Sequence, residues 1–256
     1  MSGNSKRSRW IIRAEAAYRQ FFVRYCCDRQ SSLQVAEFPK SGGSWISGMV
    51  SDLLQIDFPR NRFPASRSSL FHGHVLVRFP VKNALVVWRD PRDVMVSWYF
   101  HSIVGNSHVQ PSFVASCRRR SGIVDAGNVK SNMQKFVRWC FEDPYSPAFT
   151  WSDFYDYWSC QDCDVLKYED VLQNPVDALL SLEFLSCFSG DREASVRRVV
   201  EAHSFAKQSG RRSGVEVKGA FLRKGVAGDW VNYFDSDALA TLMSYAGDRM
   251  NGLGYT

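Results

Sequence analysis

Residues 35–45 carry the strongest structural signal in the chain and read VAEFPKSGGSW. An apolar strand-like segment, Leu33–Phe38, leads through a Lys-Ser-Gly-Gly-Ser loop into an apolar helical pattern, Ser44–Leu54. Glycines let a backbone approach an anion closely, and the unpaired N–H groups at a helix N-terminus point to the same place. This order of elements therefore predicts a phosphate-binding loop, to which Ser41 and Ser44 add hydroxyl donors.

The loop differs from that of the P-loop nucleotide hydrolases and kinases. Their pattern is Gly-x-x-x-x-Gly-Lys-Ser/Thr, in which the lysine stands at the helix end of the loop. Here Lys40 opens the loop, and no Gly-Lys-Ser/Thr triplet occurs anywhere in the chain. An ATP-dependent kinase of P-loop architecture is therefore disfavoured and is kept as the alternative enzyme class.

A second segment has the same organisation of strand, turn and helix. Ala84–Trp88 has the composition of a buried strand, residues 89–93 read RDPRD, and Pro91–Ser102 has a helical pattern. Pro91 is typical of a first helical turn, and Asp93 suits the positive end of the helix dipole. The segment predicts a second polar cluster at the end of a strand.

Arg89 and Ser97 are the candidate ligands of this second segment. Arg89 would lie at the carboxyl end of its strand, and Ser97 would lie about two turns into the helix. Ligands of parallel sheets bind at the carboxyl ends of the strands, so both side chains could reach one phosphate beside the sheet.

Together the two segments resemble the sulfotransferase family that uses 3′-phosphoadenosine 5′-phosphosulfate (PAPS). That family carries a PKSGxxW loop and, downstream, an apolar strand followed by RxP(R/K)DxxxS. The segment LKYEDV at Leu166–Val171, with Asn174-Pro175 after it, and the segment FLRKGVAGDW at Phe221–Trp230 resemble two further family segments. The resemblance covers about residues 33 to 235. It implies a single P-loop-like α/β domain with a central parallel sheet flanked by helices.

The resemblance also implies a donor site, in which PAPS binds and adenosine 3′,5′-bisphosphate is left as product. The first loop would hold the 5′-phosphosulfate, Arg89 and Ser97 the 3′-phosphate, and Trp45 and Phe205 the two faces of adenine. Tyr168 would contact the nucleotide, and the C-terminal Arg-Lys-Gly would close over it. The implied nucleotide-binding residues are Lys40, Ser41, Gly42, Gly43, Ser44, Trp45, Arg89, Ser97, Tyr168, Phe205, Arg223, Lys224 and Gly225.

Sulfuryl transfer sets three requirements for the protein. It must align an acceptor hydroxyl with the sulfur, remove the hydroxyl proton, and stabilise charge on the departing phosphate oxygen, and it needs no metal. Lys40 matches the residue that meets that oxygen as a point charge. His74 falls at the family histidine and is the expected base. His72 falls at the family lysine, so His72, or a carboxylate not identified, is the alternative base.

Composition agrees with this interpretation. At 256 residues and 45% hydrophobic content the chain can form one α/β core without a second domain. The seven cysteines show no paired spacing, which favours reduced thiols and a cytoplasmic protein, and the single C-x-x-C at Cys160–Cys163 has no second half for a metal site. No apolar run of about 18 residues and no signal peptide is found, which predicts a soluble or peripheral protein.

The N-terminal thirty residues are set apart by charge. They contain seven basic and two acidic side chains, so five of the six net positive charges lie there. Apolar and aromatic residues recur at helical spacing between Ile11 and Tyr25, which predicts a basic amphipathic helix within residues 1–30. This helix would either contact an anionic membrane through residues 6–25 or pack its apolar stripe on the sheet. Residues 31–256 would form the sulfotransferase domain.

Further predictions concern helices, a strand and loops. Helices are expected at Val129–Glu142, Glu169–Leu185, Arg192–Ala202 and Ser236–Arg249, and a strand at Val165–Tyr168. Val104–Asn128 and Lys207–Gly219 lack periodicity, and residues 207–225 are expected to form a mobile lid.

The acceptor and other partners are predicted from charge. The basic N-terminus and the cluster Arg118–Arg120 favour a carbohydrate or glycolipid hydroxyl over a phenolic or hydroxylated small molecule. His101 and His108 are expected to be solvent-exposed, with the acceptor side as the alternative. No nucleic-acid motif is found, so no nucleic-acid partner is expected, although a nucleotide- or nucleic-acid-binding module is kept as the non-enzymatic alternative.

Overall fold

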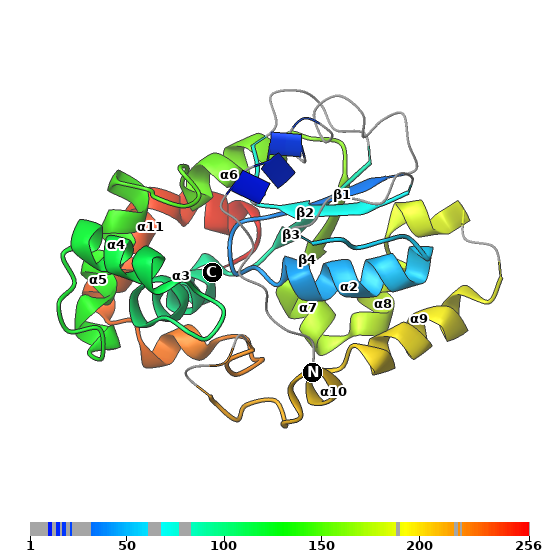
Figure 1. The fold of residues 1–256 in the computed structure, drawn as a ribbon. Helices are drawn as coiled ribbons and strands as arrows, with labels where there is room; N and C mark the ends of the chain where they lie inside the picture. Colours follow the sequence, from blue (N-terminus) through cyan, green and yellow to red (C-terminus); the bar gives the residue numbers. More distant parts are fainter. Residues whose placement is uncertain are drawn as a thin grey trace.

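The computed structural model describes residues 32–60, 68–76, 83–187, 190–217, 220 and 222–255, together with helical positions 10–11, 14–15, 17–18 and 21. Its described strands form one four-stranded sheet in the order β2-β1-β3-β4, with every neighbouring pair parallel (Figure 1). The strands are β1 (Leu33–Glu37), β2 (Leu70–Gly73), β3 (Ala84–Trp88) and β4 (Asp164–Lys167). The register pairs Val35 with both His72 and Leu85, and Val87 with Leu166.

The helices lie on both faces of this sheet. Their bounds are α2 Gly43–Leu54, α3 Pro91–Tyr99, the π-helical turn η2 Phe100–Val104, α4 Pro111–Ser121, α5 Val129–Glu142, α6 Trp151–Trp158, α7 Tyr168–Gln173, α8 Pro175–Leu180, the 3₁₀ turn η3 Glu183–Cys187, α9 Arg192–Ala202, α10 Phe205–Ser209, the 3₁₀ turn η4 Asp229–Asn232 and α11 Ser236–Gly252.

Two hydrophobic cores form because successive strand side chains point to opposite faces. Val86 and Trp88 of β3 belong to a core that includes α3, α5, α6 and α11, whereas Leu85 and Val87 belong to one that includes α2, α8 and α9. Figure 1 shows α3, α5 and α11 on one side of the sheet and α2, α8 and α9 on the other. Every residue of β1 and β3 is buried, as in the central strands of a parallel sheet. The predicted α/β class is confirmed.

Two predicted features were wrong. The region Val104–Asn128 contains a helix, α4, in which only Cys117 and Ser121 are buried. That helix shows no apolar stripe, and its ends are marked instead by Pro111 in the first turn and by Gly122 in a left-handed conformation.

The predicted helix Glu169–Leu185 is divided into α7, α8 and η3. The division occurs at Asn174-Pro175, where the Asn174 side chain accepts a hydrogen bond from the Asp177 amide and Pro175 begins the new helix. Strand β2 and helix α6 were not predicted. In α6 the start is marked by a capping box in which Thr150 and Asp153 bond each other's backbone amides.

Within the described residues, none of the helices combines the length and the apolar content that a membrane span requires. The predicted domain boundary between residues 30 and 31 lies outside the described residues.

Candidate active site

The predicted phosphate loop joins the end of β1 to the start of α2. Two of its residues have left-handed backbone conformations, Lys40 at φ 76° and Gly42 at φ 94°. A Cβ atom on Gly42 would lie 2.5 Å from Cδ2 of Tyr168, so both the backbone angle and the ring require glycine here. Ser41 is buried and Ser44 is half-buried beside it. The loop therefore has the tight shape that the sequence predicts.

Three cationic side chains from separate segments act on this loop. Burial lowers the pKa of Lys40 to about 8; nearby Glu37 opposes the shift, while the charges of Arg89 and Arg223 add to it. The charges of Arg89 and Arg223 therefore act on Lys40, which follows the carboxyl end of β1.

Arg89 lies at the end of β3, as predicted. Its Nη1 donates to the Lys40 carbonyl at 2.9 Å, and its guanidinium lies 4.2 Å from the centre of the Tyr168 ring. Its buried Nε has no hydrogen-bond partner within the described part of the chain. A buried donor without a partner is costly, so this atom fits a ligand that brings an acceptor.

Asp93, in the segment of residues 89–93, joins that segment to residues 228–230 near the C-terminus. Its carboxylate accepts hydrogen bonds from the backbone amides of Gly228 at 2.6 Å and Trp230 at 2.9 Å. Arg92 lies over the Trp230 ring at 4.3 Å. Glu169 similarly joins the LKYEDV segment to the second segment by accepting from the Asp90 amide at 3.0 Å. These contacts explain why segments far apart in sequence meet at one site.

Arg223 and Lys224 are paired with acidic side chains. Arg223 contacts Glu216 and Asp229, each at 2.6 Å, and Lys224 contacts Asp229 at 2.6 Å. The Arg223 guanidinium also lies 4.5 Å from the Phe100 ring centre. Ser97 precedes Phe100 by three residues in continuous helix, so the two share a helix face. The structure thus brings Arg223 to the face of α3 that carries Ser97.

The predicted aromatic residues gather beside the loop. Trp45 meets Tyr168 edge to face with ring centres 6.0 Å apart, and its indole N–H donates to the His203 carbonyl at 2.8 Å. Phe205 follows His203 by two residues and packs against Gly225, where a Cβ atom would lie 2.5 Å from the Phe205 ring. The segment His203–Phe205 therefore links Trp45 to the C-terminal Arg-Lys-Gly.

The hydrogen bond of His74 sets its tautomer. Nδ1 lies 3.0 Å from the backbone carbonyl of Glu37, and a carbonyl only accepts, so Nδ1 carries the hydrogen and Nε2 has the free lone pair. Desolvation lowers the pKa of His74, against the pull of Glu37, which favours the neutral ring. Because the residue is exposed, solvent limits this shift.

Sequence reasoning missed Glu37. Its carboxylate is buried and lies 2.7 Å from Nε2 of His72 and 2.5 Å from the Gly43 amide. The available signal was an acidic residue at the end of an otherwise apolar strand, where burial of a charge requires partners.

His101 lies on the inner side of the site, so the expectation that it is solvent-exposed was wrong. The ring is half-buried and stacks on Trp98 with centres 5.2 Å apart. Burial, with the charges of Lys40 and His74, lowers its pKa to about 4, so the ring is neutral at physiological pH. His108 is exposed, as expected.

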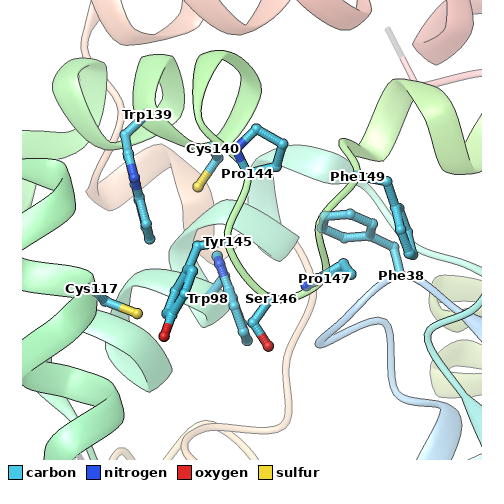
Figure 2. Close-up of a pocket in the computed structure, with 10 residues that line it drawn as sticks. All are labelled: Phe38, Trp98, Cys117, Trp139, Cys140, Pro144, Tyr145, Ser146, Pro147 and Phe149. Carbon is cyan, nitrogen blue, oxygen red and sulfur yellow. The ribbon is translucent and has the colours of Figure 1, made fainter.

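A small aromatic pocket of about 10 Å³, room for about one water, lies next to these histidines. Figure 2 shows Phe38 and Phe149 at one end and Trp139 and Cys117 at the other. Phe38 precedes Lys40 by two residues, and Trp98 stacks on His101, so the pocket adjoins the Lys40 loop. The lining consists of Phe38, Trp98, Cys117, Trp139, Cys140, Pro144, Tyr145, Ser146, Pro147 and Phe149, none of which is charged. Within the described chain no cluster of three or more His, Cys, Asp or Glu residues could hold a metal ion.

Comparison with known proteins places the chain in a family. The sequence model of the sulfotransferase domain matches residues 64–254, a range that begins after the Lys40 loop. Cytosolic sulfotransferase 8 of Arabidopsis thaliana is 24% identical over 280 residues, covering 88% of this chain and 78% of the relative. Sulfotransferase 6B1 of Danio rerio is 22% identical over 241 residues, covering 80% and 74%.

Two solved structures share the fold over most of the chain. Mouse sulfotransferase SULT7A1 complexed with PAP superposes with a TM-score of 0.62 at 15% identity, covering 92% of this chain and 89% of that one. Retinol dehydratase in complex with androsterone and the inactive cofactor PAP superposes with a TM-score of 0.58 at 15% identity, covering 86% and 80%.

Proposed function

The chain belongs to the sulfotransferase domain family and is a sulfotransferase, and we propose that it transfers the sulfuryl group of PAPS to the hydroxyl group of an acceptor. The observation that carries this proposal is the contact between two cationic residues at one loop, where Arg89 donates to the Lys40 carbonyl at 2.9 Å and the charge of Arg223 also acts on Lys40. These cations fit a donor that carries several negative charges. The Arg89 Nε, which has no hydrogen-bond partner among the described residues, adds a buried donor for such a ligand.

The nucleotide would bind across the carboxyl ends of β1 and β3. The loop Ser41–Trp45 at the start of α2 would receive its 5′ end, and Arg89 and Ser97 would bind its 3′-phosphate. Trp45, Tyr168 and Phe205 provide aromatic surface for adenine. Arg223, Lys224 and Gly225 close the site from the C-terminal segment, which requires Arg223 and Lys224 to exchange part of their pairing with Glu216 and Asp229 for the ligand.

The donor supplies an activated sulfuryl group, and the residues of this chain supply a charge and a proton acceptor. Lys40 donates to the phosphate oxygen on which charge develops. His74 holds Nε2 free for the acceptor proton because the Glu37 carbonyl fixes the hydrogen on Nδ1. The low pKa of His101 makes that ring a neutral neighbour on the acceptor side.

For the acceptor, we infer a phenolic or hydroxylated apolar molecule that displaces part of this aromatic wall, because the cavity itself, about 10 Å³, has room for about one water. Its walls are aromatic, proline and cysteine side chains, which stack on flat apolar groups and offer few hydrogen bonds to a sugar. This lining outweighs the charge distribution, which favours a carbohydrate or glycolipid. The charged residues behind that preference, Arg118–Arg120, do not line the pocket.

Residues 6–25 would add a peripheral membrane contact to a cytoplasmic enzyme. The described stripe residues Ile11, Tyr18 and Phe21 are 46%, 38% and 57% exposed, whereas packing on the sheet would bury them. Sedimentation with anionic liposomes should show binding that weakens with salt, as expected for arginine contacts to lipid headgroups. A chain that ignores liposomes at low salt would contradict the contact.

Residues 207–225 would form the lid over the nucleotide. In its described part, Arg211 Nη1 donates to the Val215 carbonyl at 2.8 Å, Ser213 donates to the Gly225 carbonyl at 2.5 Å, and Lys207 pairs with Glu201. Limited proteolysis should cut after Arg211-Arg212, and adenosine 3′,5′-bisphosphate should slow the cut. Equal rates with and without the nucleotide would contradict a ligand-closed lid.

Calorimetry tests the donor assignment. Adenosine 3′,5′-bisphosphate should bind far more tightly than adenosine 5′-phosphate, because each charged contact to the 3′-phosphate contributes about 1.5–3 kcal/mol. Equal affinities for the two nucleotides would contradict a binding site for the 3′-phosphate. Preferential binding of ATP would favour the kinase alternative.

A further inference from the structure

Glu37 occupies the place where the phosphate loop presents its first helical amide. Its Oε2 accepts a hydrogen bond from the Gly43 amide at 2.5 Å, and Gly43 is the first residue of the twelve-residue helix α2. The side chain is buried, with 5% of its surface exposed. A carboxylate of the protein thus binds the amide that the proposed 5′-phosphate would need.

The surrounding residues are shaped for this carboxylate. Its second oxygen lies 2.7 Å from Nε2 of His72. A Cβ atom on Gly43 would lie 2.6 Å from Cδ of Glu37 and 2.8 Å from Nε2 of His72. Any other residue at position 43 would therefore displace the pair, so the second glycine of the loop, the carboxylate and the histidine form one unit.

The carboxylate is charged in this position. Burial alone would raise the pKa of Glu37, but the hydrogen bond and charge of His72, with the hydrogen bond from the Gly43 amide, outweigh it and hold the pKa below its ordinary value. An ionised carboxylate and a phosphate cannot share one amide hydrogen, and they repel each other at that distance.

We propose that Glu37 sets the affinity of the site for the 5′ end of the nucleotide, because its carboxylate must release the Gly43 amide before a 5′-phosphate can bind there. This inference rests on the proposed function, which places the 5′-phosphate at the start of α2. Glu37 then turns toward His72, which remains its partner. The same exchange in reverse weakens the hold on the product and favours its release.

Two nucleotides separate this role from a structural one. Adenosine 3′,5′-bisphosphate competes with Glu37 for the Gly43 amide, whereas adenosine 3′-phosphate lacks the competing group and binds only through the 3′ side and the adenine. Calorimetry of both ligands on the full chain compares wild type with Glu37→Gln, which keeps the shape of the side chain and removes its charge. Glu193→Gln removes the same charge from an exposed pair with Arg197 on α9 and serves as the control.

Glu37→Gln should bind adenosine 3′,5′-bisphosphate roughly tenfold more tightly, because a neutral amide releases the Gly43 N–H more readily than a carboxylate does. Adenosine 3′-phosphate should bind the variant and wild type equally, which also shows that the variant is folded. Glu193→Gln should change neither affinity. Unchanged or weaker bisphosphate binding in folded Glu37→Gln, or an equal change for both nucleotides, would overturn the proposal.

If Glu37→Gln does not fold, as judged by circular dichroism, Glu37→Asp replaces it. Its shorter side chain withdraws the carboxylate from Gly43, so tighter bisphosphate binding is again expected, and its absence would overturn the proposal. Failure of the proposed function gives a different result, because wild type would then show no binding of adenosine 3′,5′-bisphosphate. Binding by wild type that Glu37→Gln leaves unchanged contradicts the role of Glu37 alone.

Discussion

On the proposed donor side of the molecule, Lys40, Arg89 and Arg223 each come from a short continuous motif, whereas the proposed acceptor pocket collects Phe38, Trp98 and Phe149 from three separate elements. The donor side is held by hydrogen bonds between motifs, such as those from Gly228 and Trp230 to Asp93. The pocket is held by ring contacts, such as Phe38 against Phe149 at 6.2 Å. The proposed nucleotide site is thus built from backbone hydrogen bonds and charged side chains, and the proposed acceptor pocket from contacts between aromatic side chains.

Among the substitutions, we expect the largest effect on turnover from His74, which would lie between the donor and the acceptor. His74→Gln removes the base but keeps a side chain that can donate to the Glu37 carbonyl, so turnover should fall by a factor of about 10² to 10⁴. Affinity for adenosine 3′,5′-bisphosphate, measured by calorimetry, should stay close to that of wild type. Near-normal turnover would move the base to His72 or to a carboxylate and leave the donor side intact.

Lys40 should affect chemistry and donor binding together. Lys40→Met keeps much of the side-chain volume and removes the charge at the departing oxygen, so turnover should fall by a factor of about 10² to 10³. Nucleotide affinity should fall as well, while the KM for the acceptor stays nearly constant in steady-state assays. If only the KM for the acceptor changes in Lys40→Met, Lys40 contacts the acceptor and not the donor.

The pH dependence of nucleotide binding follows from the same lysine. Burial lowers the pKa of Lys40 from the ordinary lysine value of 10.5 to about 8, so Lys40 is cationic below pH 8 and loses its charge above it. The dissociation constant of adenosine 3′,5′-bisphosphate should therefore rise with pH, by up to about tenfold between pH 8 and 9. Lys40→Met should remove this dependence. A flat wild-type profile from pH 7 to 9.5 would contradict the cationic role.

The smallest effect is expected in the pocket. Phe149→Leu removes an aromatic wall and about 0.5–1.5 kcal/mol of ring contact, so the KM for a phenolic acceptor should rise several-fold. Donor affinity should not change, and Val124→Ala, at a side chain 93% exposed, provides the surface control. A change in donor affinity in Phe149→Leu, without a change in acceptor KM, would show that the pocket does not receive the acceptor.

The same contrast explains what could be predicted from sequence. Helices Val129–Glu142 and Arg192–Ala202 were predicted to the residue, as was strand Ala84–Trp88, because their apolar patterns are regular. Strand β2 was not predicted because its second half, His72-Gly73, does not have the composition of a strand. The donor-site residues were predicted from their motifs, and the structure places Arg89, Tyr168 and Trp45 beside the Lys40 loop.

The pocket and Glu37 could not be found in that way. The pocket depends on long-range packing between the end of β1, α3, α4, α5 and the segment Pro144–Phe149, which no local pattern encodes. Glu37 lies in a strand whose other residues are apolar or amide, and its partners His72 and Gly43 are apparent only from the register of β1 with β2 and the start of α2. Residue roles that depend on distant partners require the structure.

A transfer assay tests the central claim most directly. Radiolabelled PAPS is incubated with the full chain and a panel of phenols, hydroxylated apolar molecules and saccharides, beside a parallel reaction with radiolabelled ATP. The account predicts label transfer from PAPS to phenolic or apolar hydroxyls and none from ATP. Transfer from ATP without transfer from PAPS to any hydroxyl would contradict it.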